Sequence, residues 1–286
     1  MNAVIDPFIP SARVRAVVFA LVVIGFAVTA FVADVAAPSS RGYPPLFGTL
    51  VAQIAPLVWF FANVAMLFGV YVEWRRIYRS LRVQPAPGWL VLATAIAVAV
   101  PSIAAMLNGD AGVLLLYAIM LGFSFALCGQ DRLDWTAGGV VLAIPAAIQL
   151  PMVIVGAAVV LGFVARESKR GVTLTVAYAI GLALWLVAIP ELVFGSAAHI
   201  DVAPRSVALF AVAAVVLLVV ARRASPLELT VVFGVTCIAV AGSAGFTLAL
   251  PFLGAAPLLL LDRGKPRAAQ WLAMAGMMGM VAVHAM

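Results

Sequence analysis

The sequence predicts an all-α fold: a polytopic integral membrane helical bundle that forms a single transmembrane domain over residues 1–286. Hydrophobic residues make up 66% of the chain and charged residues only 10%, whereas soluble domains carry about 25% charged residues. The mean hydropathy is +1.19. Long apolar runs recur along the chain with basic residues at their ends, which is typical of membrane helices and their loops.

The apolar runs define the expected elements in order. They cover residues 16–33, 45–72, 88–107, 111–127, 136–165, 172–190, 206–221, 227–247, 248–261 and 268–283. Most are close to the length of one crossing, about 20 residues. We expect the first run to remain as a membrane anchor, because no small-x-small cleavage site follows it cleanly. The two cysteines, Cys128 and Cys237, are not expected to form a disulfide.

The run 136–165 decides the topology. As one helix it would be about 45 Å long, against a hydrocarbon core of about 30 Å. Pro145 and Pro151 favour a break within it. We therefore predict a hairpin of two short helices, whose turn near Gln149 faces protein or a wet cavity, because lipid cannot satisfy a broken backbone. A plain proline kink is the alternative.

The distribution of basic residues favours the hairpin. With the N-terminus inside, the hairpin places every one of the 17 Lys and Arg residues inside except Arg41 and Arg205. A single crossing would divide them almost evenly, whereas basic residues normally collect in cytoplasmic loops. The prediction is therefore about 11 membrane segments with the C-terminus outside.

The same distribution indicates the partners. The net charge of +6 is explained by basic residues that collect in cytoplasmic loops. We therefore expect membrane lipids as partners and expect no nucleic-acid partner. The basic segment 73–82 continues the second run into the interface, where it should contact anionic lipid.

Acidic residues fall into two groups. The inner acids, among them Glu73, Asp131, Asp134 and Glu167, lie among arginines and are interpreted as solvated loop charges. The acids at the outer ends of the runs are Asp34, Asp110, Glu191 and Asp201. The other polar residues expected at that side are Arg41, Tyr43, Asn108, Gln149, His199 and Arg205.

Those outer groups could line one cavity that binds a cation, a sugar or a phosphate headgroup. Ordinary loop polarity is the alternative, and it is preferred for Asp201 and Arg205, which share a loop with Pro204. No motif for a metal site, a phosphate loop or a nucleophile elbow is present. No ionisable residue lies near the middle of a long run, which argues against a secondary transporter.

Several short motifs occur in a fixed order. They are Tyr43-Pro-Pro-Leu-Phe47 with Ala55-Pro-Leu57, then Asn108-Gly-Asp-Ala-Gly112, then Thr136-Ala-Gly-Gly139 through Gln149-Leu-Pro151, and finally Gly242-Ser-Ala-Gly245 through Leu250-Pro251. In this order they resemble the polytopic C-type glycosyltransferases of family 87. The resemblance implies a bacterial inner-membrane enzyme of mannosyltransferase type that uses a polyprenyl-phosphate sugar on the outer face.

The resemblance also implies a role for Asp34, and the sequence departs from the family pattern at several positions. It makes Asp34 the catalytic residue. Only the stretch 35–42 separates Asp34 from Tyr43, where the family has a long outer segment. Gln149 stands where the family has Lys, and Gly109-Asp-Ala-Gly112 replaces Gly-Gln-x-Asn.

Three hypotheses follow. In the first, Asp34 is the general base of a sugar transfer, Arg41 offsets donor phosphate charge, and Asp110 or Glu191 helps to hold a divalent cation, the one cofactor this hypothesis allows. In the second, the chain is a non-catalytic membrane subunit that packs beside other proteins of a larger complex. The third, a ten-helix transporter, is disfavoured by the odd number of crossings and by the absence of an internal repeat.

Overall fold

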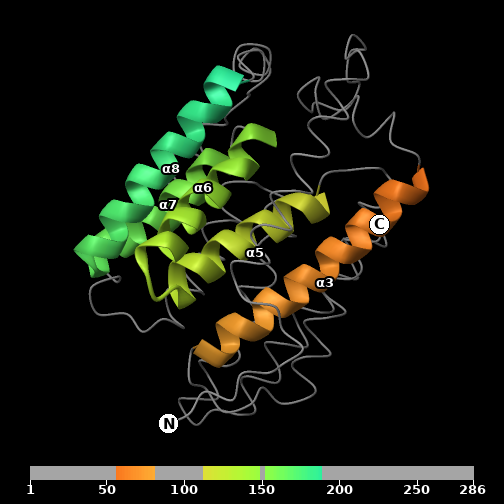
Figure 1. Cartoon of the computed structure of the whole chain (residues 1–286), viewed down its shortest axis with the longest axis horizontal. Coiled ribbons are helices and arrows are strands. Elements are labelled where there is room, and N and C mark those ends of the chain that lie inside the picture. Colours follow the sequence, from red (N-terminus) through yellow and green to blue (C-terminus); the bar gives the residue numbers. More distant parts are fainter. Residues whose placement is uncertain (1–55, 81–111, 149–151, 189–286) are drawn as a thin grey trace, which may run out of the picture.

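The computed structural model describes residues 56–80, 112–148 and 152–188, and this part of the chain is all-helical, as the sequence predicts. Its helices are α3 (Pro56–Ser80), α5 (Gly112–Cys128), α6 (Arg132–Ile148), α7 (Met152–Arg166) and α8 (Ser168–Ala188). Figure 1 shows α3 and α8 on opposite sides of a middle layer that contains α5, α6 and α7. Within these ranges, no helix is both long enough and apolar enough to cross a membrane.

The predicted break in the run 136–165 is present. α6 ends at Ile148 and α7 begins at Met152, so the run forms two helices. Pro145 lies inside α6, which means that this proline alone does not end the helix. The turn itself, residues 149–151, lies outside the described residues, and so does the environment predicted for Gln149.

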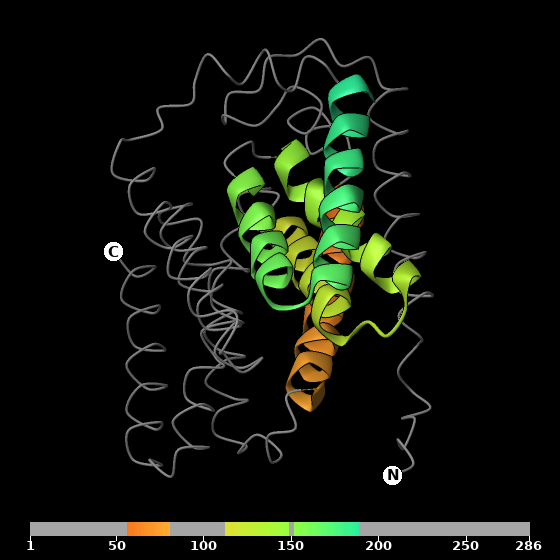
Figure 2. The same ribbon diagram turned by 90° about the vertical axis from the view of Figure 1, so that its left-hand side faces the viewer.

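The chain reverses direction between α7 and α8. α7 and α8 lie side by side and are joined at one end, as Figure 2 shows. Near the start of α7 the carbonyl of Val153 accepts a 2.8 Å hydrogen bond from the Tyr178 hydroxyl, which belongs to the middle of α8. At the other end of α7 the Gly171 amide bonds to the Glu167 carbonyl at 2.8 Å, which closes the turn into α8. α7 and α8 are therefore antiparallel neighbours.

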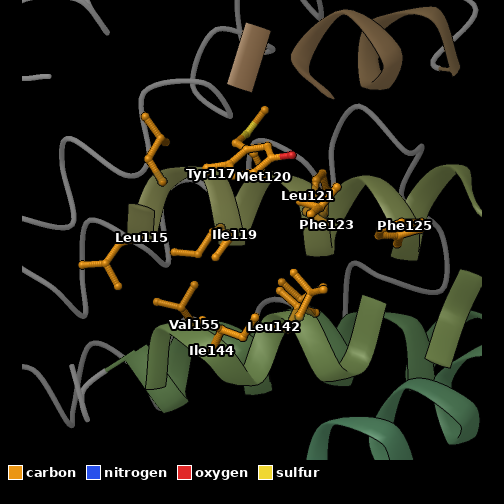
Figure 3. Packing of buried hydrophobic residues seen from close by; sticks show 14 of the residues in the cluster. Leu115, Tyr117, Ile119, Met120, Leu121, Phe123, Phe125, Leu142, Ile144 and Val155 are labelled. Atoms are coloured by element: carbon orange, nitrogen blue, oxygen red, sulfur yellow. The ribbon is translucent and has the colours of Figure 1, made fainter. Parts of the chain in front are cut away.

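The core is built around α5. Every residue from Val113 to Ala126 is buried, as expected of a helix that is hydrophobic on all sides. Figure 3 shows Leu142 and Ile144 of α6 and Val155 of α7 in the cluster that packs around it. Because α5 contacts both α3 and α6, it fixes the positions of the helices on either side.

α6 and α8 approach each other through small residues. A Cβ atom on Gly139 would lie 2.7 Å from the Leu174 carbonyl oxygen and 2.7 Å from the Ala177 Cβ. A Cβ atom on Gly181 would lie 2.8 Å from the Ala143 Cβ. Each helix thus contributes two small residues one turn apart, the pattern that allows close helix packing.

Candidate functional site at the basic end of the bundle

The residues predicted to form the outer site lie outside the part of the chain that the structure describes. They are Asp34, Arg41, Tyr43, Asn108, Asp110, Gln149, Glu191 and His199. The outer cavity therefore stays a prediction. A divalent cation held by Asp110 or Glu191 has the same status. Within 56–80, 112–148 and 152–188, no cluster of three or more His, Cys, Asp or Glu side chains could hold a metal ion.

What the structure does bring together is the basic end of the bundle, defined here as residues 73–80, 126–135 and 163–170. It contains every Lys and Arg of the described residues, namely Arg75, Arg76, Arg79, Arg132, Arg166, Lys169 and Arg170. Cys128 Sγ lies 4.0 Å from the Arg76 carbonyl oxygen, which joins α5 to α3. Arg170 contacts the last turn of α5, which joins α8 to the same place. The segments that the charge distribution assigned to one side of the membrane therefore meet at one end of the bundle.

Arg170 fastens α8 to the end of α5. Its Nη1 donates to the carbonyl oxygens of Ala126 and Leu127, each at 3.4 Å. The last carbonyls of a helix have no partner within the helix and carry the negative end of its dipole, so a guanidinium group suits them. The Arg170 guanidinium also lies over the rings of Trp135, at 5.1 Å, and Phe163, at 5.7 Å. One side chain thus connects α5, α6, α7 and α8.

Arg76 contacts α5 from the α3 side. Its guanidinium lies 5.8 Å from the centroid of the Phe125 ring, and its Nη1 is 3.8 Å from Glu73 Oε2. Arg170 has the same relation to Glu167, with Nε 3.3 Å from Oε2. Each arginine therefore follows a glutamate three residues earlier on its own helix, and the two pairs are anchored to the same end of α5.

The interpretation of Glu73 as a solvated loop charge is wrong. Its side chain is 0% exposed, because α3 continues unbroken to Ser80 and places Glu73 on the buried face with Val70 and Ile77. The spacing of these buried residues by three or four is that of one helical face. Helical phase was the feature of the sequence that could have revealed this burial.

The inner acids on the described loops and helix starts are in contact with solvent. Asp131 and Glu167 are exposed and Asp134 is half-buried. Asp131 and Asp134 cap α6: the Asp134 amide donates to Asp131 Oδ1 at 2.8 Å, and the Gln130 amide donates to Asp134 Oδ2 at 3.2 Å. The Asp131 carboxylate thus satisfies an amide in the first turn of α6, as an N-cap residue does, and the Asp134 carboxylate reaches back to the residue before the cap.

Cys128 is a free cysteine at the end of α5, beyond the apolar run 111–127. Burial raises the pKa of its thiol, and side-chain hydrogen bonds with Ser80 and Ser124 lower it by less. The thiolate is the reactive form of cysteine, so the burial and the raised pKa both disfavour reaction. We therefore expect this thiol to be unreactive in the folded protein.

We expect Cys128 to react with a maleimide at least about 10-fold more slowly than an exposed cysteine at pH 7, because less thiolate is present. The measurement uses the folded protein with Cys237→Ser, and Ser168→Cys in a background without native cysteines serves as the exposed reference. Raising the pH should accelerate the reaction of Cys128, and denaturation should remove the difference. Equal rates in the folded state would show that the thiol is open to solvent.

Arg170→Gln should lower the thermal stability of the purified protein. The change removes a charge from the carbonyl oxygens of Ala126 and Leu127 and leaves them less well satisfied, which costs about 1–3 kcal/mol of unfolding free energy. Arg132→Gln is the matched control, since Arg132 is exposed at the same end and should change stability by less than about 0.5 kcal/mol. Equal midpoints of thermal unfolding for the two variants would show that Arg170 does not fasten the helices.

Comparison with protein families, with curated proteins and with solved structures gives no match to this chain.

Proposed function

We propose that this chain is a polytopic protein of the bacterial inner membrane that transfers a sugar from a polyprenyl-phosphate donor at the outer face. The observation that supports the membrane assignment is that the described helices expose apolar side chains and bury polar ones. The outward faces of α3 and α8 carry exposed apolar side chains, whereas Asn63, Glu73 and Ser124 are buried. The exposed residues are Phe61, Val64, Phe68 and Tyr71 on α3, and Val172, Val176, Ile180, Leu184 and Val187 on α8.

Such faces are unfavourable in water and favourable in lipid. Each Å² of apolar surface kept from water contributes about 25 cal/mol, and soluble monomers rarely expose continuous apolar patches. In a bilayer the lipid-facing residues are apolar, and polar side chains turn toward neighbouring helices. With 66% hydrophobic residues over the whole chain, the bilayer is the solvent that suits this polarity.

The basic end sets the proposed orientation. Basic residues are retained on the cytoplasmic side, so the ends of α3, α5 and α7 and the starts of α6 and α8 face the cytoplasm. The opposite end then faces outward, together with the turn between α6 and α7. The full proposed topology keeps about 11 segments, with the N-terminus inside and the C-terminus outside.

Two features support the transferase. The ordered motifs from Tyr43 to Pro251 resemble family 87, and two short helices, α6 and α7, are what that resemblance implies for the run 136–165. In this proposal Asp34 takes the proton of an acceptor hydroxyl, the acceptor oxygen bonds to the sugar, and polyprenyl phosphate leaves. Arg41 offsets the charge of the departing phosphate.

A non-catalytic subunit on the same scaffold is the second candidate. The shortness of the stretch 35–42 favours it, because that stretch cannot form one wall of an acceptor cleft. Gln149 favours it as well, since this amide carries no charge for a lipid phosphate.

Proteoliposomes with the purified chain and a radiolabelled polyprenyl-phosphate mannose separate the two candidates. Sugar transfer by the chain alone supports the enzyme. A stable stoichiometric complex on purification, together with no turnover on any lipid-linked sugar, supports the subunit and contradicts the enzyme.

A further inference from the structure

The outward face of α3 is apolar over most of its length and basic at its C-terminal end. Its exposed residues are Phe61, Val64, Phe68 and Tyr71, followed by Arg75 and Arg79. They are three or four positions apart, so they lie on one face of the helix. Phe68 is 66% exposed, more than any other large hydrophobic residue described on α3. The face is therefore apolar for several turns and then cationic for the last two.

The lengths of the two parts match one leaflet of a bilayer. The apolar stretch from Phe61 to Tyr71 is about 15 Å long at 1.5 Å per residue. Half of a hydrocarbon core of about 30 Å is the same length. Arg75 and Arg79 follow within about 6–12 Å of Tyr71 along the axis, at the level where the phosphates of that leaflet lie.

The same order occurs on α8, read in the opposite direction. Lys169 is exposed at the start of the helix, and Val172, Val176, Ile180 and Leu184 follow along its outward face. α3 and α8 lie on opposite sides of the bundle (Figure 1), yet both cationic ends belong to the basic end. The arrangement is therefore a property of this end of the bundle and not of one helix.

Neighbouring basic residues have different positions. Arg76 and Arg170 are turned toward the end of α5, where they stack on aromatic rings. Arg75 and Lys169, each adjacent in sequence to one of them, are exposed. The outward faces of α3 and α8 therefore both end in exposed cations.

We propose that the outward face of α3 is a docking surface for an anionic phospholipid of the cytoplasmic leaflet. The acyl chains lie along the face from Phe61 to Tyr71, and the headgroup phosphate pairs with Arg75 and Arg79. The proposal rests on the membrane assignment above and adds a headgroup preference. A zwitterionic headgroup carries its own cation beside the phosphate and so gains less from two arginines. Two such charges are together worth about a 10- to 30-fold preference for the anionic lipid.

The test titrates the full-length protein in a nonionic detergent with phosphatidylglycerol or phosphatidylcholine of identical chains, and native mass spectrometry measures the first dissociation constant. The unmodified protein should bind phosphatidylglycerol about 10- to 30-fold more tightly. Arg75→Gln with Arg79→Gln should remove the preference and leave phosphatidylcholine binding unchanged. Arg75→Lys with Arg79→Lys should restore most of it, since charge is the attraction.

Arg79→Gln alone should weaken phosphatidylglycerol binding by about 5-fold, since one charge near the headgroups contributes about 1 kcal/mol. Arg132→Gln is its matched control. It removes the same charge from the basic end but lies on α6, outside the face of α3, and should change phosphatidylglycerol binding by less than about twofold. Equal affinity of the unmodified protein for the two lipids overturns the proposal. So does an equal loss in Arg132→Gln and Arg79→Gln, because the effect would then be unspecific charge. Extraction of the chain from membranes by alkaline carbonate would instead overturn the membrane assignment, so the two failures are distinguishable.

Discussion

Asp34→Asn should lower the rate of sugar transfer by about 10²–10⁴-fold, the usual effect of losing a positioned general base. An amide keeps the shape and much of the hydrogen bonding of the carboxylate but cannot take a proton at neutral pH. The initial rate is measured in proteoliposomes with a labelled polyprenyl-phosphate sugar. Size-exclusion elution of the variant should match that of the unmodified protein, because Asp34 lies at the end of its run and its loss should cost little stability.

Asp201→Asn provides the matched control. It makes the same change at an outer acid that shares a loop with Pro204 and Arg205, and it should leave the rate within about twofold, as expected of a group that takes no part in proton transfer. A normal rate in Asp34→Asn would refute the assignment of the base. A parent protein with no turnover, whose complexes assemble normally with Asn at position 34, would favour the subunit.

Gly139→Val should have the largest effect on stability. The first atom of any side chain at this position would meet the Leu174 carbonyl oxygen and the Ala177 Cβ at 2.7 Å, and neither is the end of a flexible side chain. α6 and α8 would have to separate along their closest contact. Overpacking typically costs about 1–3 kcal/mol and occasionally more. Because Gly139 is closed by a backbone oxygen and a Cβ atom, we expect a cost at the upper end of that range, a large share of a typical stability of about 5–15 kcal/mol.

The measurement is the midpoint of thermal unfolding in detergent, with size-exclusion chromatography to detect aggregation. Ala179→Val on α8 is the control, because Ala179 is exposed and its substitution adds the same side chain to one of these helices without entering the contact. A midpoint for Gly139→Val equal to that of the control would mean that α6 and α8 are not packed as closely as described.

The division of the run 136–165 into two helices was predictable because several independent properties agree on it. The run 136–165 is too long for one crossing, it contains prolines, and basic residues flank both of its ends. The boundary of α5 was also predictable, since the run 111–127 lies within one residue of the helix Gly112–Cys128 at each end. Hydropathy marks such boundaries well when polar residues end the run abruptly.

Glu73 was not predictable by the same means. Because Arg75, Arg76 and Arg79 are close to it in sequence, the segment was predicted to lie in solvent. The burial of Glu73 depends instead on which face of α3 packs against α5. Hydropathy reports the environment of a segment and not of a side chain. The close contact of Gly139 with α8 depends on how α6 and α8 pack, so it could not be predicted from the sequence of either helix alone. The outer site joins residues from distant loops, for which charge and motif order support a hypothesis only.

The sidedness of the turn between α7 and α8 tests the membrane account most directly. A single cysteine at Ser168, which is exposed at the start of α8, is placed in a protein with Cys128→Ser and Cys237→Ser. Right-side-out membrane vesicles are treated with an impermeant maleimide before and after permeabilisation, and Met286→Cys in the same background reports the opposite face. If the basic end is cytoplasmic and the C-terminus is outside, residue 168 is labelled only after permeabilisation and residue 286 before it. Labelling of residue 168 in intact vesicles would contradict the hairpin topology and the cytoplasmic position of the basic end.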